Sequence, residues 1–326
     1  MNIDRIRLIV QIFLFLFFVY GGLLSLSIGN AIPTMTCIYA KYRGGFCFLY
    51  PFQRYLSVPL TTLLFTGSLM MFLVYMGTFC IWAFVFNKAW CGWACPLGLL
   101  QDLLSKLREA LDIDVSRFQW ITRYRFTSVK YILLVLLILI PIGMSNSFFG
   151  SPKLSPDMAV PFCQICPGKP LIPFFHGDFS TIKIDFSNMT RTVMTVLSMG
   201  IAGLFLAGSF LKRRFMCSYC PMAAMLSIFD KIGLISLKKN GDKCTRCGNC
   251  LRACPMDIVE IAQEKEKVNM VTPDCILCMR CVEVCPENDA LRATICGKTV
   301  FRSSAKGFLK RQQAIASKLT GNDTEL

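Results

Sequence analysis

Eight cysteines toward the carboxyl end of the chain form two runs with the same spacing, CTRCGNCLRACP and CILCMRCVEVCP. In each run two, two and three residues separate the cysteines, and a proline follows the last one. Zinc ribbons use two separate cysteine pairs, so this pattern disfavours a zinc site. It is the ligand spacing of paired four-iron four-sulfur (4Fe-4S) clusters. The cysteines are Cys244, Cys247, Cys250 and Cys254 in the first run and Cys275, Cys278, Cys281 and Cys285 in the second.

Three cysteines of such a run bind one cluster, and the fourth binds the other cluster. Residues 240–296 resemble a bacterial two-cluster ferredoxin throughout, which implies a small α+β domain that carries electrons. We therefore expect cluster 1 to be held by Cys244, Cys247, Cys250 and Cys285. Cluster 2 is then held by Cys275, Cys278, Cys281 and Cys254.

The remainder of the chain is apolar enough to lie in a membrane, with 54% hydrophobic residues overall. A spanning helix needs about 20 apolar residues, and four segments meet that length. They are residues 8–29, 58–86, 131–150 and 192–211. The first is too long, and lacks a clear cleavage site, for a signal peptide. We predict a four-helix membrane domain (1–236), a cytoplasmic ferredoxin domain (237–296) and a basic tail (297–326).

Lysines and arginines gather beside one set of helix ends, which predicts a multi-pass protein of the cytoplasmic membrane with both termini in the cytoplasm. On that side are Arg5, Arg7, Lys88, Lys106, Arg108, Arg117, Arg123, Arg125, Lys212, Arg213 and Arg214. The opposite loops carry fewer, namely Lys41, Arg43, Arg54, Lys153, Lys169 and Lys183. Topology and a basic tail then explain most of the net charge of +15. The ferredoxin segment is not a basic face, so nucleic acid binding is not indicated.

Two segments of the membrane part resemble each other, because each has basic residues, two cysteines, a proline and then an amphipathic stretch. They are NKAWCGWACPLGLLQDLLSKL after the second span and KRRFMCSYCPMAAMLSIFDKI after the fourth. Each half also has a cysteine pair on the opposite side. The pattern predicts a two-helix unit used twice. We call Cys91, Cys95, Cys217 and Cys220 the inner set, after the predicted side of the membrane, and Cys37, Cys47, Cys163 and Cys166 the outer set.

The inner set offers four thiolates, which suit a third 4Fe-4S cluster. A dithiol couple or structural zinc remains an alternative, although a neighbouring ferredoxin favours a cluster. The outer set faces an oxidising compartment, where disulfides are the default. A fourth cluster is the alternative, and it would lie across a hydrocarbon core of about 30 Å from the inner one. Cys80 and Cys296 are expected to be packed thiols.

The sequence lacks the motifs that several common cofactors require. His176 is the only histidine, so no haem can be held by paired histidines, and no CxxCH run is present. There is no glycine-rich nucleotide motif, and the four spans carry no charged residue of the kind that pumps use. The aromatic and methionine-rich spans are compatible with a quinone site between helices. The tail is typical of a solvated basic helix or a disordered end, or of a clamp that holds the ferredoxin close to anionic lipid or an acidic partner.

Nearly the whole chain resembles the NapH family of membrane polyferredoxins, whose relatives include MauN, the C-terminal half of NosR and the cupric reductase CcoG. The resemblance rests on the four spans, the CGWACP turn at Cys91–Pro96, the second cysteine-proline turn and the tandem ferredoxin. It implies an iron-sulfur subunit that passes electrons from quinol toward a nitrate reductase system. The CSYCP turn at Cys217 is one residue shorter than the family's usual CxxxCP. The family pattern does not assign the outer set.

We therefore expect a membrane-anchored carrier that moves single electrons between a quinone or cytoplasmic donor and another redox subunit. An enzymatic alternative is a metal or disulfide reductase, as in CcoG, with exposed cysteine pairs as the reactive site. A further alternative is a redox sensor or assembly factor.

Overall fold

The computed structural model describes residues 3–26, 34, 36–65, 67–113, 128–145 and 159–321 of the chain. These residues form two compact units, each described here by itself. Unit 1 comprises Met1–Ile9, Phe84–Trp93 and Ser227–Leu326, and unit 2 comprises Val10–Ala83 and Ala94–Leu226. The predicted boundary after residue 236 falls inside a strand, so the division follows tertiary contacts rather than chain order.

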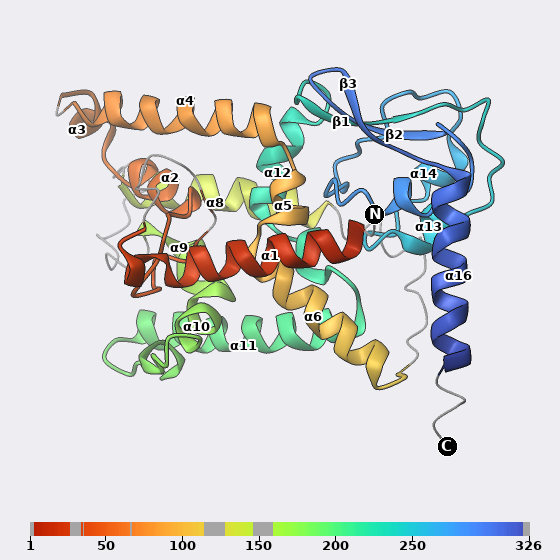
Figure 1. The fold of residues 1–326 in the computed structure, drawn as a ribbon. Coiled ribbons are helices and arrows are strands. Elements are labelled where there is room, and N and C mark those ends of the chain that lie inside the picture. Colours follow the sequence, from red (N-terminus) through yellow and green to blue (C-terminus); the bar gives the residue numbers. More distant parts are fainter. Residues whose placement is uncertain are drawn as a thin grey trace. The chain divides into compact units, whose positions relative to one another are not determined.

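Unit 1 is built on a three-stranded antiparallel sheet with strand order β1-β2-β3 (Figure 1). The strands are β1 (Ile235–Lys239), β2 (Leu291–Ile295) and β3 (Lys298–Arg302). A two-residue turn, Cys296-Gly297, joins β2 to β3, and both residues have positive φ, as a tight hairpin turn requires. The sheet therefore extends into the predicted basic tail. Cys296 is exposed in this turn, which corrects its assignment as a packed thiol.

Short helices surround the ferredoxin loops of unit 1, and α15 anchors two more distant segments. Ile3 N donates to Glu283 Oε1 at 3.0 Å, and Arg311 pairs with the same carboxylate at 2.9 Å. The basic segment thus forms helix α16, which is ion-paired to α15 rather than wholly solvated. The helices of this unit are α5 (Ala89–Trp93), α13 (Asn249–Ala253), α14 (Glu260–Gln263), α15 (Arg280–Glu283), α16 (Ala305–Gly321) and the 3-10 turn η6 (Ser227–Phe229).

Three helices in the described part of the chain are long and apolar enough to cross a membrane, at Ile3–Leu24, Ser68–Phe86 and Met189–Leu211. They correspond to α1 (Ile3–Tyr20) with η1 (Gly21–Leu24), α4 (Ser68–Phe86) and α11 (Met189–Leu211). The predicted third span corresponds to α8 (Val129–Ser145), which is shorter, and its predicted continuation lies outside the described residues. Arg117, Arg123, Arg125 and Lys153 also lie outside them.

The predicted outer loops of unit 2 contain short helices that pack along the long ones. α2 and α9 contact α8, while α9 and α10 contact α11. Two further helices pack on the same long helices: α6 contacts α11, and α12 contacts α8. The short elements are α2 (Leu49–Leu56), α3 (Leu60–Phe65), α6 (Pro96–Ala110), α9 (Pro161–Ile165), α10 (Gly168–Phe174), α12 (Pro221–Leu226), η4 (Ser180–Ile182) and η5 (Phe215–Ser218). The helices that follow Cys47, Cys95, Cys166 and Cys220 are therefore packed into this unit.

Candidate iron-sulfur cluster sites

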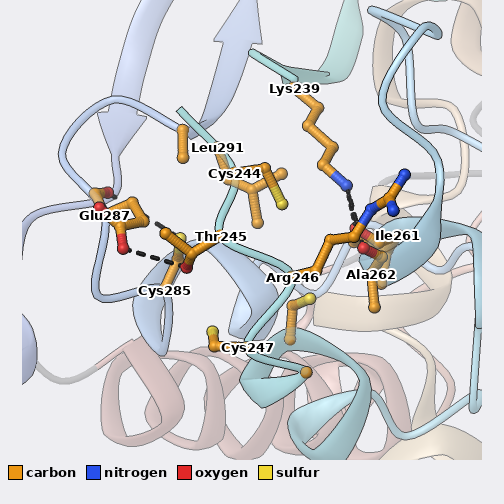
Figure 2. A pocket seen from close by; sticks show the side chains of 13 residues that line it. Lys239, Cys244, Thr245, Arg246, Cys247, Ile261, Ala262, Cys285, Glu287 and Leu291 are labelled. Atoms are coloured by element: carbon orange, nitrogen blue, oxygen red, sulfur yellow. Dashed lines mark hydrogen bonds between the residues drawn. The ribbon is translucent and has the colours of Figure 1, made fainter. Parts of the chain in front are cut away.

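One cavity of unit 1 is lined by the four cysteines predicted for cluster 1, with Cys244, Cys247 and Cys285 visible around it in Figure 2. The fourth, Cys250, lies on α13. Thr245 Oγ1 donates to Glu287 Oε1 at 3.1 Å, which ties the first cysteine run to the turn after the second. The two runs thus meet at one cavity, as crossed ligation requires.

Lys239, at the end of β1, places a buried ammonium group beside this cavity (Figure 2). Its Nζ donates to the carbonyl oxygens of Ile261 at 2.8 Å and Glu264 at 2.5 Å. Burial raises the pKa of the Cys250 thiol to about 11, and Lys239 acts in the opposite direction. Without metal this thiol is protonated at neutral pH, so cluster binding releases its proton.

A second cavity of unit 1 is lined by Cys254, Cys275, Cys278 and Cys281, the four predicted for cluster 2. Ile258 N lies 3.5 Å from Cys254 Sγ as a hydrogen-bond donor. Cys275, Cys278 and Cys281 are buried, whereas Cys247 of the first cavity is exposed. The second site is therefore better shielded from water than the first.

The turn that carries Cys91 packs directly on the loop of the second cavity. Trp93 Nε1 donates to Leu277 O at 3.0 Å. At Gly92 an added Cβ would lie 2.3 Å from Ile276 O, so only glycine allows the backbones to approach this closely. Cys91, a predicted ligand of the inner set, is thereby fixed in unit 1 beside the ligand loop of cluster 2.

A buried ion pair secures the same contact. Lys88 Nζ lies 2.7 Å from Asp230 Oδ2 and donates to Pro273 O at 2.8 Å. Both side chains are almost wholly buried. Lys88 also interacts electrostatically with Cys275. The pair holds residues before α5 against the start of the cluster 2 loop.

The other three inner-set cysteines, Cys95, Cys217 and Cys220, gather in unit 2, where their thiols interact with one another. Gln101 on α6 holds the second turn in place. Its Oε1 accepts from Met216 N at 2.9 Å, and its Nε2 donates to Cys217 Sγ at 3.9 Å and to Leu97 O at 3.3 Å.

Arg214, just before the second cysteine turn, is completely buried and has positive φ. Its Nε donates to Asp102 Oδ1 at 2.9 Å and its Nη2 to Asp102 Oδ2 at 2.5 Å. Such a bidentate pair is both strong and directional. The guanidinium also interacts with Cys217 and Cys95, so it adds a cation next to the inner set.

All four cysteines of the outer set also gather in unit 2, where each thiol interacts electrostatically with others of the set. They are free thiols in the structure. Gln53 on α2 holds the second turn. Its Oε1 accepts from Phe162 N at 3.0 Å, and its Nε2 donates to Cys163 Sγ at 3.4 Å and to Leu49 O at 2.9 Å.

Cys47 of the outer set lies beside the middle part of α4 rather than beside either of its ends. Phe48, next to Cys47, stacks on Phe79 of α4 with ring centroids 4.0 Å apart. Farther along α2, Tyr55 meets Tyr75 at 5.8 Å. Because Phe79 precedes the end of α4 at Phe86 by seven residues, Cys47 lies about 10 Å from that end along the helix axis.

The two sets of unit 2 are therefore neighbours. Cys47 interacts electrostatically with Cys95, and a Cβ added at Gly168 would lie 3.5 Å from Cys166 Sγ and 3.8 Å from Leu97 Cδ1. This corrects the expectation that a membrane thickness separates them. The physical reason is that α2, α9 and α10 fold back along the long helices instead of covering their ends.

Among the residues that the structure describes, no three cysteine, histidine or acidic side chains converge closely enough to bind one metal ion. Burial of Cys91 and Cys163 argues against reactive, exposed thiol pairs.

Sequence reasoning missed the polar residues around these sites: Lys88, Lys239, Asp102, Arg214, Gln53 and Gln101. Most are single residues without a motif. One signal was present, because five residues separate both Cys47 from Gln53 and Cys95 from Gln101.

Comparison with known families agrees with these sites. Residues 236–286 match a family model described as a 4Fe-4S dicluster domain. A model described as a 4Fe-4S binding domain matches twice, at residues 68–113 and 194–240, and these segments contain the cysteines of the inner set. No solved structure matches the chain.

Similar proteins cover most of the chain. YccM of Escherichia coli is 28% identical over 64% of this chain, which spans 51%, about half, of YccM. The uncharacterized protein MJ0750 of Methanocaldococcus jannaschii is 30% identical over 64% of this chain and 72% of its own length. The ferredoxin-type protein NapH of Escherichia coli is 25% identical over 64% of this chain and 62% of its own length. These matches confirm the predicted family: the chain belongs to the NapH-type ferredoxin proteins of membranes, whose 4Fe-4S segments it shares.

Proposed function

We propose that the chain is a membrane-bound electron-transfer subunit that relays single electrons between a quinone or cytoplasmic donor and another redox subunit. Cluster 1 is held by Cys244, Cys247, Cys250 and Cys285, and cluster 2 by Cys254, Cys275, Cys278 and Cys281. The inner set holds a third cluster. The ferredoxin part and both termini lie in the cytoplasm.

One observation carries this proposal: the turn with Cys91 is packed on the cluster 2 loop. Gly92 and Trp93 contact Ile276 and Leu277 directly. Cys91, a proposed ligand of the third cluster, thus lies close in space to the loop that carries the proposed ligands of cluster 2. This contact within unit 1 supports electron transfer by way of Cys91.

The clusters supply one-electron chemistry when bound, and the chain supplies the rest. Lys239 places positive charge beside the ligands of cluster 1, which would stabilise the more negative reduced state of that cluster. Burial of the cluster 2 cysteines excludes water. The Gly92 contact keeps the turn with Cys91 close to the cluster 2 loop within unit 1.

The test is iron analysis of anaerobically purified full-length protein. The double variant Cys217→Ser/Cys220→Ser should lose about four irons per chain, the content of one cluster, while the ferredoxin signals persist. Cys80→Ser, which changes an exposed cysteine of α4, is the matched control and should lose none. Unchanged iron in the double variant would refute the third cluster.

A second measurement addresses adjacency. If cluster 2 and the third cluster are neighbours, their reduced forms should interact magnetically in electron paramagnetic resonance spectra. The interaction should disappear in the Cys217→Ser/Cys220→Ser variant and persist in Cys80→Ser. A wild-type spectrum that is the simple sum of isolated centres would count against the proposed relay.

A further inference from the structure

The outer set repeats the construction of the inner set in unit 2. In both, a cysteine just before a helix is followed six positions later by a glutamine on that helix, Cys47 by Gln53 on α2 and Cys95 by Gln101 on α6. Both glutamines then reach a CxxCP turn more than 100 residues away in the chain.

The glutamines make the same three contacts. Each side-chain carbonyl accepts the backbone N–H just before the first cysteine of the turn, Phe162 N in one case and Met216 N in the other. Each side-chain amide donates to that cysteine's sulfur and to the backbone carbonyl four residues earlier on its own helix. Independent packing would not be expected to reproduce all three contacts.

The backbone around the sulfurs repeats as well. In both sets the N–H two residues after a cysteine approaches its sulfur, a pattern that also occurs at cluster 2. The pairs are Cys37–Tyr39, Cys47–Leu49 and Cys166–Gly168 in the outer set, Cys95–Leu97 and Cys220–Met222 in the inner set, and Cys254–Met256 and Cys275–Leu277 in unit 1. Convergent backbone amides of this kind favour a negatively charged group, such as a cluster with its thiolates.

We propose that Cys37, Cys47, Cys163 and Cys166 bind a fourth 4Fe-4S cluster, with Gln53 as the positioning residue that corresponds to Gln101. This inference rests on the proposed function in one respect, because it takes the inner set as a cluster site. The fourth cluster lies next to the third, within the helices rather than at their outer ends. It extends the relay by one site.

Disulfides are the competing use of these cysteines. Disulfides within the Cys37–Cys47 and Cys163–Cys166 pairs would not require the two pairs to meet. In the structure all four are free, and Cys166 interacts with each of the other three. Gln53 donates a hydrogen bond to one sulfur, which suits a thiolate ligand better than a disulfide.

The test is the iron and sulfide content of anaerobically purified full-length protein with the double change Cys163→Ser/Cys166→Ser. It should lose about four irons, with ferredoxin signals intact, while Cys296→Ser at the exposed hairpin turn should lose none. Retention of all iron in the double variant would overturn the proposal. A Cys37–Cys47 or Cys163–Cys166 disulfide found by mass spectrometry in fully iron-loaded protein would do the same.

Substitution of the two glutamines provides a second test, which stays valid even if the serine variants misfold. Hydrogen bonds to cluster sulfurs tune reduction potentials, so Gln53→Leu and Gln101→Leu should each lower the potential of one cluster, and not the same one. If Gln53→Leu shifts no potential, or shifts only the one that Gln101→Leu shifts, the fourth cluster is refuted. Failure of the proposed function would appear separately, as unchanged iron in the inner-set variant Cys217→Ser/Cys220→Ser.

Discussion

The inner and outer sets of cysteines share a framework of supporting hydrogen bonds, but this framework lies among different neighbours. Beside the inner set lies a buried bidentate ion pair, Arg214 with Asp102. Beside the outer set lie stacked aromatic rings, among them Phe48 on Phe79. Because charge and exposure tune cluster potentials, one construction can yield two different potentials. The difference between the sets is therefore carried by their surroundings rather than by their ligands.

The largest expected effect comes from breaking the ion pair on the inner side. Asp102→Ala leaves the buried Arg214 without its carboxylate, which should cost about 3–5 kcal/mol of stability. Replacing both partners, with Asp102→Leu and Arg214→Met, should restore much of that loss because no buried charge remains. Thermal unfolding in detergent would measure both.

Iron analysis of the same variants would test whether the ion pair supports the inner set more than the outer set. The inner set should lose its cluster in Asp102→Ala before the outer set does, because Arg214 directly precedes the inner turn. Arg213→Gln, which changes the neighbouring and more exposed arginine, is the matched control. A single variant as stable as wild type would contradict the assigned role of the pair.

The sequence was sufficient where ligands are local. Each ferredoxin run carries its cysteines within eleven residues, so spacing alone predicted which four would meet, and the structure brings the same four to each cavity. It did not indicate strand β1, because β1 exists only through pairing with β2, whose residues lie more than 50 positions later.

The position of the outer set could not be predicted for a different reason. Hydropathy identifies long apolar runs and assigns the rest to loops outside the membrane. α2 and α10 are short and contain Pro51, Pro170 and Pro173, so they carry no such run. Their place is decided by aromatic packing on α4 and by Gln53, which are tertiary contacts.

The aromatic side of the comparison can be tested with Phe79→Ala. Phe79 is buried at 2% exposure and stacks on Phe48, so its removal leaves a cavity beside Cys47, at a cost of about 3 kcal/mol or more. The outer set should lose its cluster more readily than the inner set, as judged by iron content after mild heating. Phe65→Ala, at a ring that is 87% exposed, should leave both unchanged. Equal loss from the two sets would show that the aromatic packing supports the whole bundle rather than one site.

The smallest effect is expected from the cations near the outer set. Arg43 and Lys169 both act on Cys37, but each is only partly buried and is hydrogen-bonded to a neutral acceptor, Ile38 O at 2.6 Å or Gln164 Oε1 at 2.7 Å. Lys169→Gln therefore removes a positive charge that water and salt already screen, and stability should change by less than about 1 kcal/mol. The potential of the outer-set cluster should fall slightly, and the shift should shrink as salt is raised. The inner-set potential should stay constant, because its cation, Arg214, is completely buried and already paired with Asp102. A redox titration at two ionic strengths would measure the potentials of both clusters. A salt-dependent shift at the inner set, with none at the outer set, would show that the exposed charges act on the inner set instead.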